Sequence, residues 1–252
     1  MCSVVILARP GHRWPLLVAA NRDEMADRPW RPPGRHWLDR PNVVAGLDEL
    51  GGGSWLGVND DGVVAAILNR AGTLGPADGK RSRGELVLEA LDHSDAADAV
   101  EALCDIDPAA YRPFNLLIAD NHDVYWLANL GEGEPDPVRA AAVPEGVSML
   151  TAFDLNDQRD RRVRDYLPRF RAAPPPDPET GTWTAWQTLL ASRLHDAAAG
   201  PAAAMCFITP TGFGTTSSSL IALPAASIVG GRPLWQFAAG PPDSTGYVQT
   251  PM

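Results

Sequence analysis

The sequence predicts an α+β fold in which helices cover two stacked antiparallel sheets, a four-layer αββα sandwich. Three observations lead to this prediction. Strand-like segments fall into three groups, two helix pairs separate the groups, and most neighbouring strands are joined by short hairpin-like connections. Short connections are typical of antiparallel sheets. The 252-residue chain is 45% hydrophobic and shows no internal repeat, so we expect a single domain over residues 1–252.

The chain begins with a predicted β-hairpin. Residues 2–9 and 16–20 are largely apolar and flank a turn that contains Pro and Gly. With the turn centred between residues 12 and 13, the numbers of cross-strand partners sum to about 25. Cys2 then faces the region of Asp23, within one or two residues of register.

A second hairpin is predicted at residues 55–59 and 63–69, around an Asp-Gly turn. The same arithmetic places Asn69 opposite the glycine run 51–53, where the lack of side chains lets the backbone approach another segment closely. Between the hairpins, residues 27–41 are rich in Pro, Arg and Trp. We expect them to form an irregular loop that is long enough to act as a lid.

Apolar residues at helical spacing, and a strongly charged run at residues 157–170, predict four helices. The other three cover residues 84–91, 95–104 and 184–195, and Ser94 is a candidate N-cap for the second helix. The remaining predicted strands cover residues 43–45, 114–119, 124–128, 147–151, 205–208, 215–223, 226–229 and 234–238.

Composition excludes several classes of protein. The net charge of −10 argues against nucleic acid as the main partner, because phosphate binding needs a basic face. Three cysteines without a spacing pattern predict neither a disulfide framework nor a metal site, and we expect no bound cofactor. The start lacks a basic leader, and no apolar run approaches the ~18–20 residues of a membrane span. We therefore expect a cytoplasmic protein.

Cys2 is the most informative single residue. Removal of Met1 would leave it with a free α-amine of pKa ~7.7–8.0 and a thiol of pKa ~8.5 on the same residue. The thiol nucleophile and its general base, the α-amine, would then belong to the same residue, as in enzymes with an N-terminal Thr nucleophile. The alternative is an ordinary buried cysteine, because Cys2 opens an apolar run.

Short motifs along the chain form an ordered set that carries a family resemblance. They are Met1-Cys2, the segments 19–24 (Ala-Ala-Asn-Arg-Asp-Glu), 28–29, 52–57, 68–69, 83–87, 114–116, 133–137 and 212–215. On this set the chain is identified as a member of the transport-and-Golgi-organisation protein 2 family, also called the NRDE family. The spacing of Cys2, Arg22 and Asp23 also resembles that of the N-terminal-nucleophile hydrolases that include bile-salt and penicillin V acylases.

The resemblance implies an N-terminal-nucleophile hydrolase-like fold and hydrolysis of a linear amide or thioester. In that case Cys2 would attack the carbonyl, Arg22 would stabilise the thiolate or an anionic substrate group, and Asp23 would hold the α-amine. Asn69 and Asn156 are the candidate donors to the oxyanion. The candidate substrate-binding residues around this catalytic set are Asn21, Glu24, Trp55 and Arg83.

Each role has a structural alternative. Arg22 and Asp23 could form an ion pair that holds the hairpin end, and Asn21 could cap a turn. Asn69 could make the turn that follows its strand, and Asn156 is a natural N-cap for the helix after it. Some relatives carry Ser-Asn where this chain has residues 151–152 (Thr-Ala), so the second oxyanion donor would come from Asn156 or be missing.

Two other functions remain open at this point. The family has been associated with haem trafficking and with acyl-coenzyme A or lipid metabolism, which suggests a non-catalytic carrier of haem or an acyl-coenzyme A. Its possible ligand set is Cys2, His12, His36 and Met25. The chain could also be an interaction module built around exposed tryptophans. In either enzyme or carrier form, the expected partner is a small-molecule or lipid-like ligand.

Overall fold

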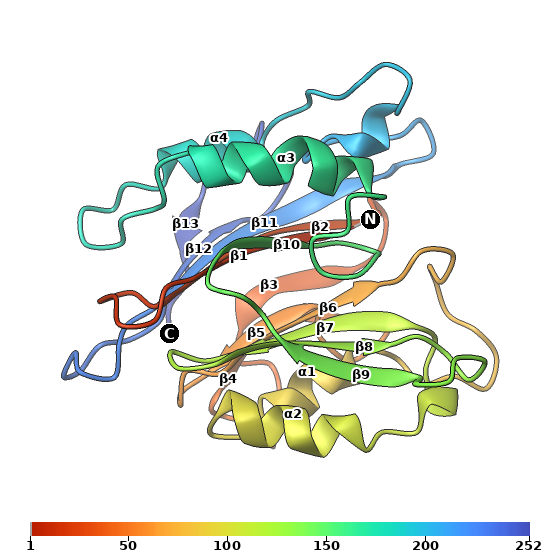
Figure 1. The fold of residues 1–252 in the computed structure, drawn as a ribbon, viewed down its shortest axis with the longest axis horizontal. Helices are drawn as coiled ribbons and strands as arrows, with labels where there is room; N and C mark the ends of the chain where they lie inside the picture. Colours follow the sequence, from red (N-terminus) through yellow and green to blue (C-terminus); the bar gives the residue numbers. More distant parts are fainter. Residues whose placement is uncertain (1) are drawn as a thin grey trace. The chain divides into compact units, whose positions relative to one another are not determined.

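The computed structural model describes residues 2–252, which divide into two compact units (Figure 1). The first unit contains the chain up to Arg28 and the segment Pro144–Pro251, and the second contains Pro29–Val143 together with Met252. Each unit has one antiparallel sheet and one pair of α-helices. The predicted α+β class with two antiparallel sheets is therefore confirmed, while the single-domain organisation stays a prediction.

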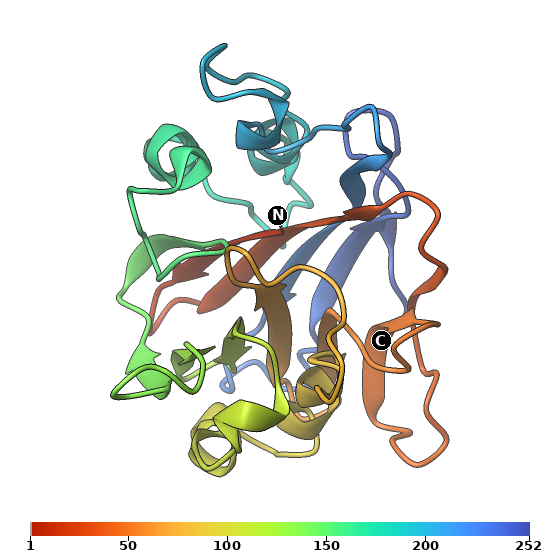
Figure 2. The same cartoon turned by 90° about the vertical axis from the view of Figure 1, so that its right-hand side faces the viewer.

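The first unit is built on a six-stranded sheet with the order β10-β1-β2-β11-β12-β13. Apolar residues at odd positions of the first two strands, such as Val5 and Ala19, pack with Tyr166 and Trp186 of two helices. Those helices cover one face of the sheet (Figures 1 and 2). The elements are β1 (Ser3–Ala8), β2 (Leu16–Met25), β10 (Gly146–Leu150), β11 (Phe213–Leu223), β12 (Leu234–Ala238), β13 (Val248–Gln249), α3 (Arg161–Ala172) and α4 (Thr184–Leu190).

The second unit is a seven-stranded sheet whose strands follow one another in chain order from β3 to β9. Its core joins Leu86 and Ala99 of the two helices to Ala65 and Leu116 of the central strands. The elements are β3 (Trp30–Gly34), β4 (Val43–Asp48), β5 (Leu56–Asn59), β6 (Val64–Asn69), β7 (Phe114–Ala119), β8 (Val124–Asn129), β9 (Val138–Ala142), α1 (Glu85–Ala90) and α2 (Ala96–Cys104).

The N-terminal hairpin forms in a register one residue from the prediction. Ser3 pairs with Asn21 and Val5 with Ala19. The second strand is longer than expected and runs through the whole segment 21–24 to Met25. It can do so because β11 pairs along its other edge, with a bulge between Thr215 and Ser217. The polar motif therefore lies inside a sheet rather than at a hairpin end.

Several sequence-based boundaries are wrong, for identifiable reasons. Residues 30–34 of the expected loop form β3, which is an edge strand and therefore tolerates its prolines. The exposed edge strand β9 lacks alternation and was not predicted. Residues 205–208 and 226–229 are not strands. The helix expected from residue 157 begins at Arg161, capped by Asp160, and Asp95 rather than Ser94 caps α2.

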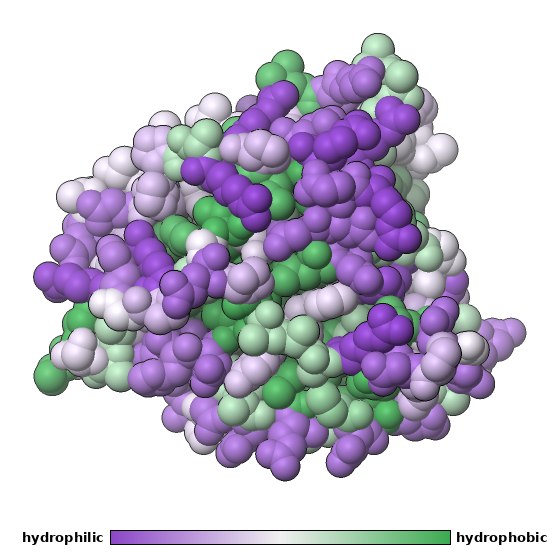
Figure 3. Space-filling view, viewed as in Figure 1, coloured by the Kyte–Doolittle hydropathy of each residue, from purple (hydrophilic) through white to green (hydrophobic). Residues whose placement is uncertain are grey.

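The outer surface shows polar side chains over much of the face in Figure 3, with apolar residues in smaller patches among them. Within residues 2–252, no helix is both long enough and apolar enough to cross a bilayer.

The glycine run before β5 brings two motifs of the second unit together. The backbone N–H of Ser54 donates to the carbonyl of Gly84 over 2.9 Å. A Cβ placed on Gly53 would lie only 2.3 Å from the carbonyl carbon of Gly84. The close backbone approach expected from the sequence thus occurs at the start of α1, and only glycine fits at residue 53.

We expect Gly53→Ala to lower the free energy of unfolding by about 1–3 kcal/mol, because the added methyl group overlaps backbone that cannot rotate away. Gly133→Ala is the matched control in the same unit, since nothing lies within 4 Å of a Cβ at that position. Urea unfolding of both variants measures the difference. A Gly53→Ala protein as stable as the control would contradict the proposed close packing.

Candidate active site

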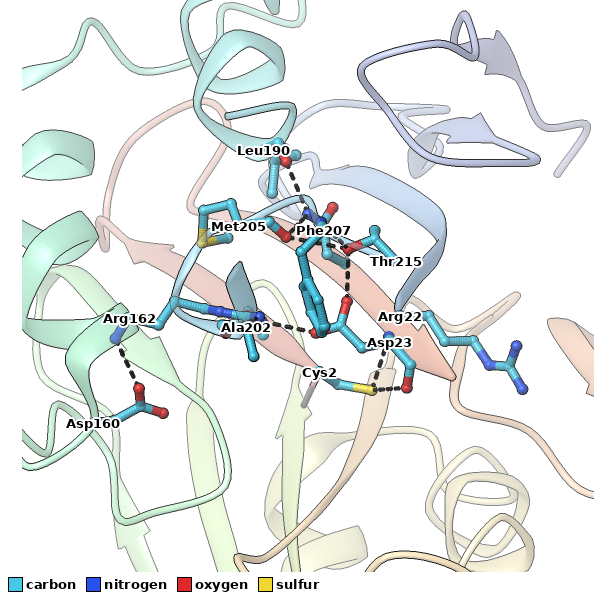
Figure 4. A network of polar contacts seen from close by, with 12 residues as sticks. Cys2, Arg22, Asp23, Asp160, Arg162, Leu190, Ala202, Met205, Phe207 and Thr215 are labelled. Atoms are coloured by element: carbon cyan, nitrogen blue, oxygen red, sulfur yellow. Dashed lines mark hydrogen bonds and ion pairs between the residues drawn. The ribbon is translucent and has the colours of Figure 1, made fainter. Parts of the chain in front are cut away.

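Cys2 lies just before β1 and contacts the backbone of the neighbouring strand (Figure 4). The backbone N–H of Asp23 donates to the Cys2 Sγ over 3.3 Å, and the thiol donates to the carbonyl oxygen of Asp23 at 3.6 Å. Both contacts are set by the register between β1 and β2, and the side chain is partly buried. The sequence-based prediction that Cys2 faces Asp23 is borne out by these contacts.

The surroundings of Cys2 favour a neutral thiol in this state. Burial raises the pKa of the Cys2 thiol above its ordinary value, and the negative charge of Asp23 raises this pKa further. The positive charge of Arg22 and the N–H of Asp23 act in the opposite direction but are weaker. A nucleophilic role for this sulfur therefore requires a nearby base that accepts its proton.

Asp23 is held by two groups that lie far away in the sequence. Its carboxylate accepts a hydrogen bond from the Thr215 hydroxyl over 2.8 Å and another from the Arg162 guanidinium over 2.9 Å. The ion pair is almost fully buried, with 3% of the Arg162 side chain and none of the Asp23 side chain exposed. The sequence suggests Arg22 as the structural partner of Asp23, and the structure supplies Arg162 from α3.

Arg22 is adjacent to Asp23 on β2, and neighbouring residues of a strand point to opposite faces of the sheet. The Arg22 guanidinium donates to the Thr216 hydroxyl over 3.2 Å. In Figure 4 it points away from the Cys2 sulfur. Its positive charge still favours the thiolate. A role in binding an anionic group of the substrate stays a prediction.

Asn21 anchors β2 to the layer of helices. Its amide nitrogen donates to the carbonyls of Leu190 and Met205, both over 2.9 Å, and its oxygen accepts from Ser218 over 2.6 Å. The expectation that Asn21 caps a turn is wrong, because it lies inside a strand. Its contacts are with the protein interior, and substrate binding by Asn21 stays a prediction.

Glu24 is half-buried and interacts with its own neighbourhood in the sequence. Its carboxylate accepts from the backbone N–H of Met25 over 2.9 Å and lies 3.8 Å from the guanidinium of Arg28. The structure therefore gives Glu24 a local partner, and its predicted substrate-binding role is not tested by these contacts.

Asn156 closes a loop onto β10 with a left-handed backbone (φ 60°). Its side-chain oxygen accepts from the Met149 N–H over 2.8 Å, and its amide nitrogen donates to the Ser148 hydroxyl over 3.1 Å. The N-cap alternative is wrong, because Asp160 accepts the hydrogen bond from Arg162 N that caps α3. The oxyanion role of Asn156 stays a prediction.

Three candidate residues belong to the second unit. Asn69 ends β6 opposite Phe114, and its side chain makes no hydrogen bond to the residues that the structure describes. Trp55 packs edge-to-face on Trp30, with ring centroids 5.7 Å apart. The Arg83 guanidinium donates to the carbonyls of Thr73 and Pro113 and so holds a loop. Their parts in an active site stay predictions.

Sequence reasoning missed Arg162 and Thr215. Thr215 lies in a quoted motif but was given no role, and its hydroxyl is aligned with Asp23 by the β2–β11 register. The sequence pattern does indicate that Arg162 is buried, because it shares one face of α3 with Tyr166 and Phe170 at a spacing of four residues. An arginine on the apolar face of a helix indicates a buried charge with a partner.

We expect Asn21→Ala to lower the free energy of unfolding by about 1–3 kcal/mol, because it leaves the buried carbonyl of Leu190 without its donor and that of Met205 with only the longer contact to the Thr215 hydroxyl, at 3.3 Å. Gln187→Ala in α4 is the control, since the Gln187 side chain makes no hydrogen bond within residues 2–252. Chemical denaturation measures both variants. Equal stabilities would show that the Asn21 bridge contributes nothing to the fold.

Comparison with solved structures supports the fold over the whole chain. An N-acylethanolamine-hydrolyzing acid amidase ortholog from Caenorhabditis elegans aligns with a TM-score of 0.55 and 10% identity, covering 99% of this chain and 100% of the other. A variant of the conjugated bile acid hydrolase from Clostridium perfringens gives 0.54 and 13%, covering 100% and 97%. Identities this low show the fold alone. The two alignments confirm the predicted N-terminal-nucleophile hydrolase-like fold.

Curated relatives agree with the motifs found in the sequence. The bovine (Bos taurus) Transport and Golgi organization protein 2 homolog is 36% identical over 132 residues, which is 48% of this chain and 46% of the relative. The human (Homo sapiens) homolog is 36% identical over 135 residues, covering 49% and 46%. The chain thus spans about half the length of the curated relatives it matches. The family described as Transport and Golgi organisation 2 matches residues 1–167, and the chain belongs to this family.

Proposed function

We propose that this chain is a hydrolase in which Cys2, exposed as the first residue by removal of Met1, attacks a linear amide or thioester. The observation that supports this most strongly is the position of the Cys2 sulfur, 3.3 Å from the N–H of Asp23 and next to a buried carboxylate. The two solved neighbours are named as an acid amidase and a conjugated bile acid hydrolase, which agrees with amide hydrolysis.

The first chemical step transfers the thiol proton to the α-amine of Cys2 while the sulfur attacks the carbonyl carbon. Burial and the charge of Asp23 disfavour a standing thiolate. An amine of pKa ~7.7–8.0 on the same residue is well placed to remove the proton during the attack. A C–S bond forms, and the electron pair of the C=O bond moves to the oxygen to give a tetrahedral oxyanion.

Collapse of this intermediate releases the first product. The protonated α-amine returns its proton to the leaving nitrogen or sulfur as the scissile bond breaks, which leaves the acyl group on Cys2 as a thioester. Water then attacks the thioester with the same amine as base, and the carboxylic acid leaves. Atoms and charges balance over acylation and deacylation together, and one water molecule is consumed for each substrate molecule.

Other side chains would fill the remaining roles in this mechanism. Asp23 would hold the α-amine, and Arg22 would offset negative charge. Asn156 has one amide hydrogen left after its bond to Ser148, which could be donated to the oxyanion. A donor of this kind contributes about 2.7–4 kcal/mol to lowering the barrier.

The haem-carrier alternative loses its proposed ligand set. Cys2 precedes β1, whereas His12 lies in the turn beyond the other end of this six-residue strand. A strand of that length spans about 20 Å, so these two side chains cannot ligate one iron. An acyl-coenzyme A is a thioester, so it belongs to the substrate class that we propose for hydrolysis.

We expect protein purified from its native host to lack Met1 and to be alkylated first at Cys2. Burial, with the adjacent Asp243, raises the pKa of Cys206 to about 11, so this thiol should stay unmodified at neutral pH. Cys104→Ser removes the remaining partly exposed thiol. Intact mass before and after brief treatment with iodoacetamide gives both results. Retention of Met1 would exclude the proposed base and with it the mechanism.

We expect Cys2→Ala to reduce hydrolysis by at least ~10³-fold, since the covalent step disappears. The assay uses N-acylethanolamines, bile-acid conjugates and acyl-coenzyme A thioesters, with a burst of leaving group as the sign of an acyl-enzyme. Cys104→Ser is the control and should keep full activity. Equal turnover by the Cys2→Ala protein would assign the activity to another site or to a contaminant.

A further inference from the structure

Arg162 of α3 contacts several groups around the proposed nucleophile, Cys2. One nitrogen, Nη1, donates to the Ser3 hydroxyl over 2.6 Å and to the Asp23 carboxylate over 2.9 Å. The other, Nη2, donates to the carbonyl of Ala202 over 2.8 Å. The guanidinium also lies over the Phe207 ring, 5.3 Å from its centroid. The group is thereby fixed on three sides (Figure 4).

These contacts join the two chain segments that position Cys2. Ser3 is the next residue after the nucleophile, and Asp23 supplies the backbone N–H that touches the sulfur. One guanidinium nitrogen therefore bridges the two strands at the point where the Cys2 side chain is held. Removing it would free the side chains of Ser3 and Asp23 from each other and from α3.

Stability alone is a weak explanation for this arrangement. Burying an arginine and a carboxylate costs solvation energy that their attraction repays only in part, and apolar pairs often serve a core equally well. The pair lies beside the one thiol to which the proposed function assigns chemistry. The charge of Asp23 raises the pKa of Cys2, and a paired guanidinium offsets that charge.

We propose that Arg162 is a positioning residue of the active site, which holds Ser3 and Asp23 in place and offsets the Asp23 charge so that Cys2 can react. The inference rests on the proposed hydrolase function. Among charged side chains, Asp23 raises the pKa of the Cys2 thiol and Arg22 lowers it, and Arg162 would act on the thiol through its ion pair with Asp23.

The test is the pH dependence of Cys2 alkylation by iodoacetamide, followed by intact mass in proteins that all carry Cys104→Ser. We expect Arg162→Met to move the midpoint upward by at least about one pH unit, which is about tenfold less thiolate at pH 7. Arg162→Lys keeps the charge and should restore part of the shift. The double variant Arg162→Met with Asp23→Asn removes both charges and should reverse most of it.

Arg169→Met is the matched control, because Arg169 also lies over an aromatic ring, that of Tyr166, but is exposed on the same helix. It should leave the midpoint unchanged. An unchanged midpoint in folded Arg162→Met, or an equal shift in the control, would overturn the inference. Should Arg162→Met fail to fold, Arg162→Lys and the double variant test the inference. We expect a lower alkylation midpoint in the double variant than in Arg162→Lys. Equal midpoints in these two proteins would exclude action through Asp23.

The readout separates this inference from the proposed function. Thiol reactivity does not depend on turnover, so retained Met1 or absent hydrolysis would reject the hydrolase while leaving the midpoint shift measurable. A normal acyl-enzyme burst in Arg162→Met, together with an unchanged midpoint, would reject the positioning role and leave the hydrolase intact.

Discussion

The antiparallel register between β1 and β2 decides where Cys2 and the segment 21–24 lie relative to each other. With Ser3 opposite Asn21, the Cys2 sulfur meets the backbone of Asp23. The same alternation turns Asn21 and Asp23 towards the helices and Arg22 towards the other face. A slip of one residue would exchange these faces. It would separate the Asn21 amide from the Leu190 carbonyl and the Asp23 carboxylate from Arg162.

The charge of Asp23 is the main electrostatic cost of this arrangement. A fully buried carboxylate is tolerated here because Arg162 and Thr215 both donate to it. Breaking such a pair by removing one partner typically costs about 3–5 kcal/mol, since an unpaired charge remains. Burial and, after it, the charge of this carboxylate raise the pKa of the Cys2 thiol, so the proposed mechanism needs a base that takes the thiol proton during the attack.

Much of the architecture follows from local patterns. The Pro-Gly and Asp-Gly turns, with apolar runs on either side, predict both hairpins, and β5 and β6 pair in the predicted register. The motif resemblance predicts the fold that the solved structures support. The edge strands β3 and β9 escaped prediction, because an edge needs neither a continuous apolar run nor alternation once its neighbour supplies the hydrogen bonds.

The sequence by itself determined the position of Cys2 relative to Asp23 to within one residue, because a single hairpin links them and turn chemistry acts over a few residues. Only the tertiary structure decided what surrounds Asp23. Its partners Arg162 and Thr215 lie 139 and 192 residues further along the chain. No local periodicity or spacing links residues so far apart, and their meeting depends on how β11 and α3 pack against β2.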